Sequence, residues 1–183
     1  RIVDFSRRFG LGEKTGIDIP GEIPGTLPSP AWKQRIFKSR WVGGDTVNMS
    51  IGQGYLAATP LQMANAVALV VNEGVIYKPH LLKEVRDPVS EKVEREVLFN
   101  STIRPSTFRQ VQEAMRRVIT HGTAKVVITT GAVKSAGKTG TGEIGVDDHW
   151  HSWFVAYAPY DAPNPEDTIV VSVGPYSLKT LAW

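Results

Sequence analysis

One predicted strand near the C-terminus constrains the fold more than any other segment of the chain. Residues 152–158 are apolar at every position after Ser152. Because successive side chains of a strand point to opposite faces, one face would carry Trp153, Val155 and Tyr157, and the other Phe154, Ala156 and Ala158. A strand with two apolar faces is typical of the centre of a sheet that is covered on both sides. Flanking strands are expected over 133–141 and 168–173, and the turn-forming residues 159–167 predict an antiparallel hairpin.

Two helices are expected to pack on this sheet. Thr59 suits the N-terminal cap of the first helix, Pro60 suits its first position, and Gly74 suits its C-terminal end. The apolar residues of 106–121 recur on one face at helical spacing, which predicts the second helix. Helices packed on an antiparallel sheet define the α+β class.

Composition excludes several classes of function. The 183 residues include 21 Lys and Arg, 18 Asp and Glu, and no cysteine, which gives a net charge of +3. The basic residues are dispersed, so no nucleic-acid-binding surface is expected. The lack of cysteine excludes disulfides, thiolate catalysis and Cys-based zinc sites. No apolar run approaches the roughly 20 residues of a membrane-spanning helix.

The chain is expected to be one domain-sized piece of a longer polypeptide, because it opens at Arg1 without Met or a signal peptide. Glycine and proline punctuate residues 1–58 and predict a loop-rich segment. The remaining expected segments are helices and an arm over 59–125, C-terminal strands over 126–175, and a truncated or atypical tail over 176–183.

Residues 135–143, Ser-Ala-Gly-Lys-Thr-Gly-Thr-Gly-Glu, form the segment richest in candidate chemistry. A phosphate-binding loop has four residues between its first glycine and Gly-Lys-Thr, and it leads into a helix. Gly131 and Gly137 have five residues between them, which disfavours nucleotide binding. A Ser-x-x-Lys nucleophile at Ser135 and Lys138 requires helical geometry. The β-branched, glycine-rich residues that follow favour a strand instead.

In a strand, Lys138 and Gly140 share one face and Thr139 points to the other. Gly140 lets a ligand backbone approach closely, Lys138 offers a charge to a carboxylate, and Thr139 or Thr141 offers a hydroxyl. An exposed strand edge can also pair with an extended peptide through main-chain hydrogen bonds. The alternative is a solvent-facing turn in which Lys138 is only hydrated.

Several motifs occur in a characteristic order along the chain. They are residues 9–12, 15–22, 51–54, 59–63, 122–124, 137–141 and 154–159, with Trp32-Lys33, Trp41 and Gly44-Asp45 between them. In this order they resemble the second half of the transpeptidase domain of class B penicillin-binding proteins. Trp32-Lys33, Trp41 and Gly44-Asp45 resemble the elongation-type penicillin-binding protein 2 branch.

The resemblance implies a β-lactamase-like transpeptidase fold and a peptidoglycan D,D-transpeptidase that acts through an acyl-serine intermediate. It implies D-Ala-D-Ala stem peptides as substrates, β-lactams as their mimics, and no cofactor. It also implies that Lys138, Thr139, Gly140 and Thr141 bind the substrate, and that the Thr141 backbone N–H is one of two oxyanion donors.

The same resemblance implies that the Ser-x-x-Lys nucleophile and a Ser-x-Asn motif lie upstream of Arg1, so this chain alone is expected to be inactive. It implies a location at the extracytoplasmic face of the bacterial cell membrane, held by an N-terminal anchor outside this chain. A membrane glycosyltransferase of the elongation machinery is the implied partner. The alternative function is a non-catalytic, penicillin-binding-like module that binds or senses peptidoglycan, and a β-lactamase is the alternative within the enzyme class.

One cluster of residues and one glutamine elsewhere in the chain also have functional and structural interpretations. Asp147, Asp148, His149 and His151 cluster in the sequence and could ligate a metal, although a solvated loop is the preferred interpretation and no metal is expected. Gln53 lies between two glycines, for which a structural role is expected rather than a catalytic one.

Overall fold

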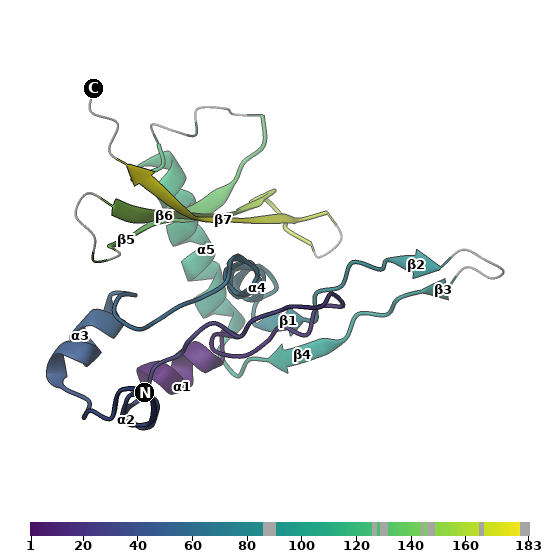
Figure 1. Ribbon diagram of the computed structural model, residues 1–183. Coiled ribbons are helices and arrows are strands. Elements are labelled where there is room, and N and C mark those ends of the chain that lie inside the picture. Colours follow the sequence, from purple (N-terminus) through teal and green to yellow (C-terminus); the bar gives the residue numbers. More distant parts are fainter. Residues whose placement is uncertain are drawn as a thin grey trace.

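The computed structural model describes residues 1–85, 91–125, 128, 132–143, 145, 149–164 and 167–179 (Figure 1). In chain order its elements are α1 (Ile2–Arg7), α2 (Pro30–Phe37), α3 (Gly43–Ser50), α4 (Pro60–Val71), β1 (Val75–Tyr77), β2 (Glu84–Val85), β3 (Glu91–Lys92), β4 (Val97–Asn100), α5 (Pro105–Thr120), β5 (Ala136–Glu143), β6 (His149–Ala158) and β7 (Ile169–Lys179). The predicted α+β class is confirmed.

The C-terminal sheet consists of three antiparallel strands in the order β5-β6-β7. β6 is central, as its two apolar faces predict. β5 begins at Ala136 rather than at residue 133, and it reaches Glu143. Close packing against β6 requires a glycine at 137, since a Cβ there would lie 2.7 Å from the Val155 carbonyl oxygen.

The last strand is longer than the predicted strand over 168–173, because β7 continues through residues 176–179 of the expected tail. β6 begins at His149, earlier than predicted, and therefore offers β7 additional backbone partners. Ser177 lies opposite His151 and Lys179 lies opposite His149. Residues 180–183 lie outside the described part of the chain.

Figure 1 shows helices α4 and α5 beside the sheet. They pack against the face that carries Val155 and Tyr157. The buried core consists of Val67, Leu69, Val70, Val71, Ile76, Phe108, Met115, Ala136, Val155 and Tyr157. Burial of such apolar surface is the main force that holds the helices to the sheet. A hydrogen bond also joins α5 to the residue before β5, because Arg116 Nη1 donates to the Ser135 carbonyl oxygen at 2.7 Å.

The expected cover on the second face of the sheet is only partial among the described residues. Ala156 is buried there, but its β7 neighbour Val171 is 42% exposed and Val173, opposite Phe154, is 43% exposed. Ile169, at the start of β7, is 68% exposed. The two apolar faces of β6 therefore predict its central place correctly but not the closure of both faces.

The start of α4 follows the predicted cap. Thr59 Oγ1 accepts from the Gln62 N–H at 3.1 Å, and Gln62 Oε1 accepts from the Thr59 N–H at 2.9 Å. Gln62 is fully buried, and its Nε2 donates to the carbonyl oxygens of Glu13 and Pro24 at 2.8 Å each. One side chain therefore caps the helix and fixes the loop-rich N-terminal segment against it.

An arm extends from this body, as Figure 1 shows on the side away from α3. β1 pairs with β4, and β2 pairs with β3 further out, both antiparallel. The Asp18 carboxylate accepts from the N–H groups of Leu81 and Leu82, which anchors the arm to the N-terminal segment. These bonds hold the pKa of Asp18 below its ordinary value. No helix within the described ranges is both long and apolar enough to cross a membrane.

The buried Tyr157 provides a test of the core. Its side chain is 1% exposed, and its hydroxyl has no hydrogen-bond partner among the described residues. Burial, with a smaller effect of Tyr160, raises the pKa of Tyr157 to about 12. An unpaired buried hydroxyl costs about 1–3 kcal/mol. Tyr157→Phe is therefore expected to raise the free energy of unfolding of the full-length gene product by about 1 kcal/mol, measured by denaturant titration.

Two variants serve as controls for this measurement. Tyr160→Phe alters a partly exposed neighbour and is expected to leave stability unchanged, whereas Tyr157→Ala creates a cavity and is expected to cost about 3–5 kcal/mol. A loss of stability in Tyr157→Phe would show that the hydroxyl is satisfied and would contradict this account of the core.

Candidate functional site

The candidate site is built on β5, an edge strand that is buried at its start and largely exposed beyond it. Ala136 and Gly137 are buried, whereas Lys138, Gly140 and Thr141 are exposed. The buried start anchors the strand in the core, so the exposed remainder projects from a fixed support.

The register of β5 fixes the faces of its side chains. Lys138 lies opposite Val155 and Gly140 opposite Trp153, so both belong to the face that carries the core. Thr139 lies opposite Phe154 and therefore belongs to the other face, as does Thr141. A Cβ on Gly140 would meet only Trp153 Cβ, at 3.4 Å, so close packing within the chain does not by itself demand a glycine there.

Alternate residues of β5 direct their backbone groups away from β6. The carbonyl oxygen of Thr139 accepts from Lys138 Nζ at 2.5 Å, and that of Thr141 lies 3.4 Å from Gln53 Nε2. The N–H and C=O of one residue in a strand point to the same side, so the N–H of Thr141 also lies on this outer edge. We use the term outer edge for the backbone groups of Thr139, Thr141 and Glu143.

The Lys138 side chain leaves the strand on the core face, but its ammonium group contacts the outer edge at the Thr139 carbonyl oxygen. Among the residues that the structure describes, it has no carboxylate partner, and its one hydrogen bond goes to the adjacent carbonyl oxygen. Thr139 Oγ1 is partnered by Thr123 Oγ1 at 2.8 Å, which links the strand to the turn after α5. Within the described part of the chain, a cation without a carboxylate partner therefore lies beside backbone groups that can bind a ligand.

A cavity of about 640 Å³ adjoins the far half of the outer edge. Its lining residues come from α3 and the loop that follows it on one side, and from β5, β6 and the connection between them on the other: Asn48, Ile51, Gln53, Gly54, Thr141, Glu143, Gly145 and Trp150. The groove that a peptide-pairing edge requires is therefore present beside Thr141.

An ion pair with little exposure positions the α3 side of this cavity. Lys33 Nζ lies 2.6 Å from Asp45 Oδ2, and the two side chains are 10% and 11% exposed. The same carboxylate oxygen accepts from the Val42 N–H at 2.7 Å, at the start of α3. The hydrogen bond from Lys33, followed by that from Val42, lowers the pKa of Asp45 below its ordinary value of 3.8.

The other interpretations of residues 135–143 do not fit the geometry. The segment from Ala136 is a strand, so Ser135 and Lys138 do not share a helical face as a Ser-x-x-Lys nucleophile requires. No helix follows Gly137, as a phosphate-binding loop would require. The segment is also not a solvent-facing turn.

The possible metal cluster lies largely outside the described residues. Asp147 and Asp148 are not described, and His151 lies in β6 opposite Gly142. Within the described part of the chain, no group of three or more His, Asp or Glu side chains could hold a metal ion.

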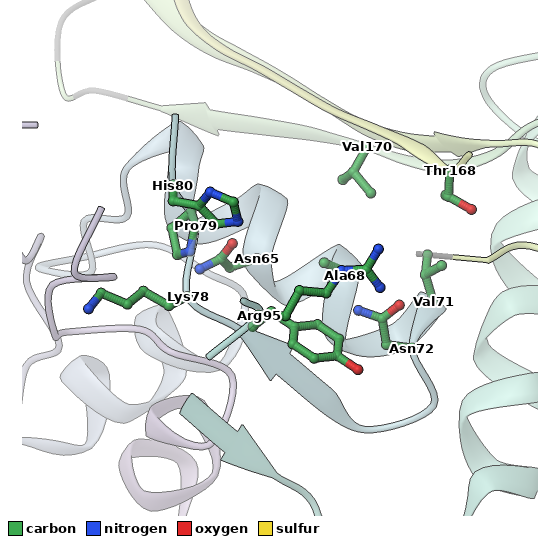
Figure 2. A pocket seen from close by; sticks show the side chains of 11 residues that line it. Asn65, Ala68, Val71, Asn72, Lys78, Pro79, His80, Arg95, Thr168 and Val170 are labelled. Atoms are coloured by element: carbon green, nitrogen blue, oxygen red, sulfur yellow. The ribbon is translucent and has the colours of Figure 1, made fainter. Parts of the chain in front are cut away.

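A second cavity, of about 300 Å³, lies between α4, the base of the arm and the start of β7 (Figure 2). Figure 2 shows Lys78 and His80 on the arm side and Thr168 and Val170 on the sheet side. Lys78 Nζ is paired with Glu96 at 2.8 Å, and His80 Nδ1 lies 2.6 Å from the Leu82 carbonyl oxygen. None of its lining residues belongs to β5, so this cavity is separate from the candidate site.

Comparison with known proteins agrees with this geometry. The family model described as penicillin binding protein transpeptidase domain matches residues 1–173. The chain therefore belongs to the penicillin-binding protein transpeptidase family. Within that family it is similar to proteins named MrdA or PBP2, which bears out the predicted branch.

Three relatives illustrate the match. Peptidoglycan D,D-transpeptidase MrdA of Haemophilus influenzae is 34% identical over 93% of this chain and 29% of its own length. The structure of Pseudomonas aeruginosa PBP2 in complex with WCK 5153 aligns with a TM-score of 0.78 at 34% identity, over 94% of this chain and 38% of that one. Helicobacter pylori PBP2 in complex with MreC aligns with a TM-score of 0.78 at 30% identity, over 94% of this chain and 31% of that one. The chain thus spans less than a third of its curated relative.

The Lys33–Asp45 pair predicts how stability depends on pH. The folded-state pKa of Asp45 is lowered, so the ionised carboxylate stabilises the folded state. This stabilisation is fully present above the unfolded-state pKa of about 4, and it is lost as the pH falls through the lower, folded-state pKa. Asp45→Asn is expected to lower the melting temperature of the full-length gene product at pH 7, and the difference from wild type is expected to shrink below about pH 4.

Asp161→Asn is the matched control, because it removes an exposed partner of Lys134 and is expected to change the melting temperature little. A difference between wild type and Asp45→Asn that stays constant from pH 7 to about pH 2.5 would contradict the assignment to this carboxylate.

Proposed function

We propose that this chain forms one wall of the active site of a peptidoglycan D,D-transpeptidase. The observation that carries the proposal is the outer edge of β5, where the Thr141 N–H lies beside an open cavity and the Lys138 ammonium, two strand positions from Gly140, has no carboxylate partner among the described residues. An edge of this kind matches the D-Ala-D-Ala end of a stem peptide, which offers an extended backbone and a terminal carboxylate.

In the proposed reaction, a serine outside these 183 residues attacks the carbonyl carbon of the penultimate D-Ala. The bond to the terminal D-Ala nitrogen breaks, D-Ala leaves, and a seryl ester remains. An amine of a second stem peptide then attacks the ester, forms the cross-link and frees the serine. A β-lactam would mimic the dipeptide and leave a slowly hydrolysed ester, and neither route requires a cofactor.

Each residue of the proposed site has a distinct part. Lys138 attracts the substrate carboxylate, the hydroxyls of Thr139 and Thr141 orient it, and Gly140 allows the peptide backbone to approach. The Thr141 N–H donates to the oxyanion that develops during attack. A donor held on a rigid strand does not reorganise as charge develops, and one such donor contributes about 3–4 kcal/mol.

The proposed setting follows from the same family. The relative from H. pylori was solved with MreC, and another similar structure is described as a peptidoglycan synthase complex. We infer an extracytoplasmic site at the bacterial cell membrane, an anchor outside these residues, and a membrane glycosyltransferase as partner in cell-wall elongation.

The class of activity is tested by incubating the full-length gene product with a penicillin and measuring its intact mass. One covalent adduct is expected, and peptide mapping is expected to place it on a serine outside these 183 residues. An adduct on Ser135 would contradict the proposed arrangement. The absence of any adduct would favour a non-catalytic peptidoglycan-binding or sensor module.

Lys138→Ala tests the proposed wall directly. Loss of a charge-assisted hydrogen bond to the ligand carboxylate is expected to lower the second-order rate constant of penicillin acylation by about 10- to 100-fold. Lys134→Ala is the control, because Lys134 lies nearby but is 61% exposed in a surface ion pair with Asp161. Equal acylation rates in the two variants would refute a role for Lys138.

A further inference from the structure

The side chain of Gln53 crosses from the loop after α3 to the outer edge of β5, between positions 88 residues apart in the sequence. In one amide orientation its Nε2 donates to the Thr141 carbonyl oxygen at 3.4 Å. In the other orientation the amide nitrogen donates to the Glu143 carbonyl oxygen and the amide oxygen accepts from the Glu143 N–H, at 3.3 Å each. The second orientation satisfies both amide atoms, as an adjacent strand would.

Both orientations leave the same backbone group available. Neither uses the N–H of Thr141, while both occupy groups next to it. The edge offered to an extended peptide therefore ends at Thr141, because the Gln53 amide takes the place that a longer partner would fill at Glu143. Gln53 thus restrains the strand directly C-terminal to the proposed oxyanion donor without competing for it.

The loop that carries Gln53 is itself well fixed. The Gln53 backbone N–H donates to the Asn48 carbonyl oxygen of α3 at 2.9 Å, and Gly52 and Gly54 adopt the left-handed φ values of 77° and 75°. On the strand side, a Cβ on Gly142 would already touch Gln53 Nε2, at 3.4 Å. The two left-handed glycines therefore shape the loop that brings the Gln53 amide to the edge, and Gly142 leaves the contact unobstructed.

We propose that Gln53 is a positioning residue for the transpeptidase reaction, which holds the outer edge of β5 so that the Thr141 N–H stays aimed at the reacting carbonyl. This inference rests on the proposed function. It differs from an oxyanion-hole role because Gln53 acts on the donor through the strand and does not contact the substrate carbonyl.

The test compares penicillin acylation of the full-length wild type with Gln53→Leu, which keeps a side chain of similar size and removes the hydrogen bonds of the amide. Gln110→Leu on the exposed face of α5 is the matched control. Gln53→Leu is expected to lower the first-order acylation rate constant about tenfold. The dissociation constant of the complex before acylation and the melting temperature are expected to stay close to wild type, as they do in the control.

The outcomes separate this inference from the function on which it rests. No acylation of the wild type would overturn both. Normal acylation of Gln53→Leu would overturn the positioning role alone. So would a variant in which binding is weakened and the melting temperature is lowered along with the acylation rate constant. If Gln53→Leu does not fold, Gln53→Asn decides, because it withdraws the amide from the edge while staying polar, and the same selective fall in the acylation step is expected.

Discussion

An edge strand leaves every second residue with backbone groups that no neighbouring strand can use, and this constraint underlies the whole arrangement. In β5, Lys138, Gly140 and Gly142 face β6 with their backbone groups, while Thr139, Thr141 and Glu143 face outward. Exposed edges invite uncontrolled pairing. Here the edge is short and carries an exposed lysine, and one glutamine side chain lies against its far end.

The rest of the fold places and stiffens this edge. α4 and α5 bury the start of β5 against the core, and the hydrogen bond from Arg116 to the Ser135 carbonyl oxygen fixes where the strand emerges. On the opposite side of the cavity, the Lys33–Asp45 pair holds α3, which in turn carries the loop with Gln53. Donors that are fixed in advance are the ones that stabilise a developing charge most effectively.

Local rules predicted much of this structure from the sequence. The cap at Thr59, the helix to Thr120 and the central place of β6 each follow from neighbouring residues or from side-chain periodicity. The reach of Gln53 to β5 could not be predicted, because no periodic pattern connects segments so far apart; its two flanking glycines were the only signal. The extension of β7 to Lys179 depends on a partner strand and was missed for the same reason.

The central claim is that the outer edge of β5 is a wall of the acyl-transfer site. A crystal structure of the full-length gene product acylated by a penicillin tests it most directly. The account predicts the acyl carbonyl oxygen about 3 Å from the Thr141 backbone nitrogen and the ligand carboxylate beside Lys138. An adduct whose carbonyl oxygen finds its hydrogen-bond donors elsewhere, with the edge of β5 left unoccupied, would contradict it.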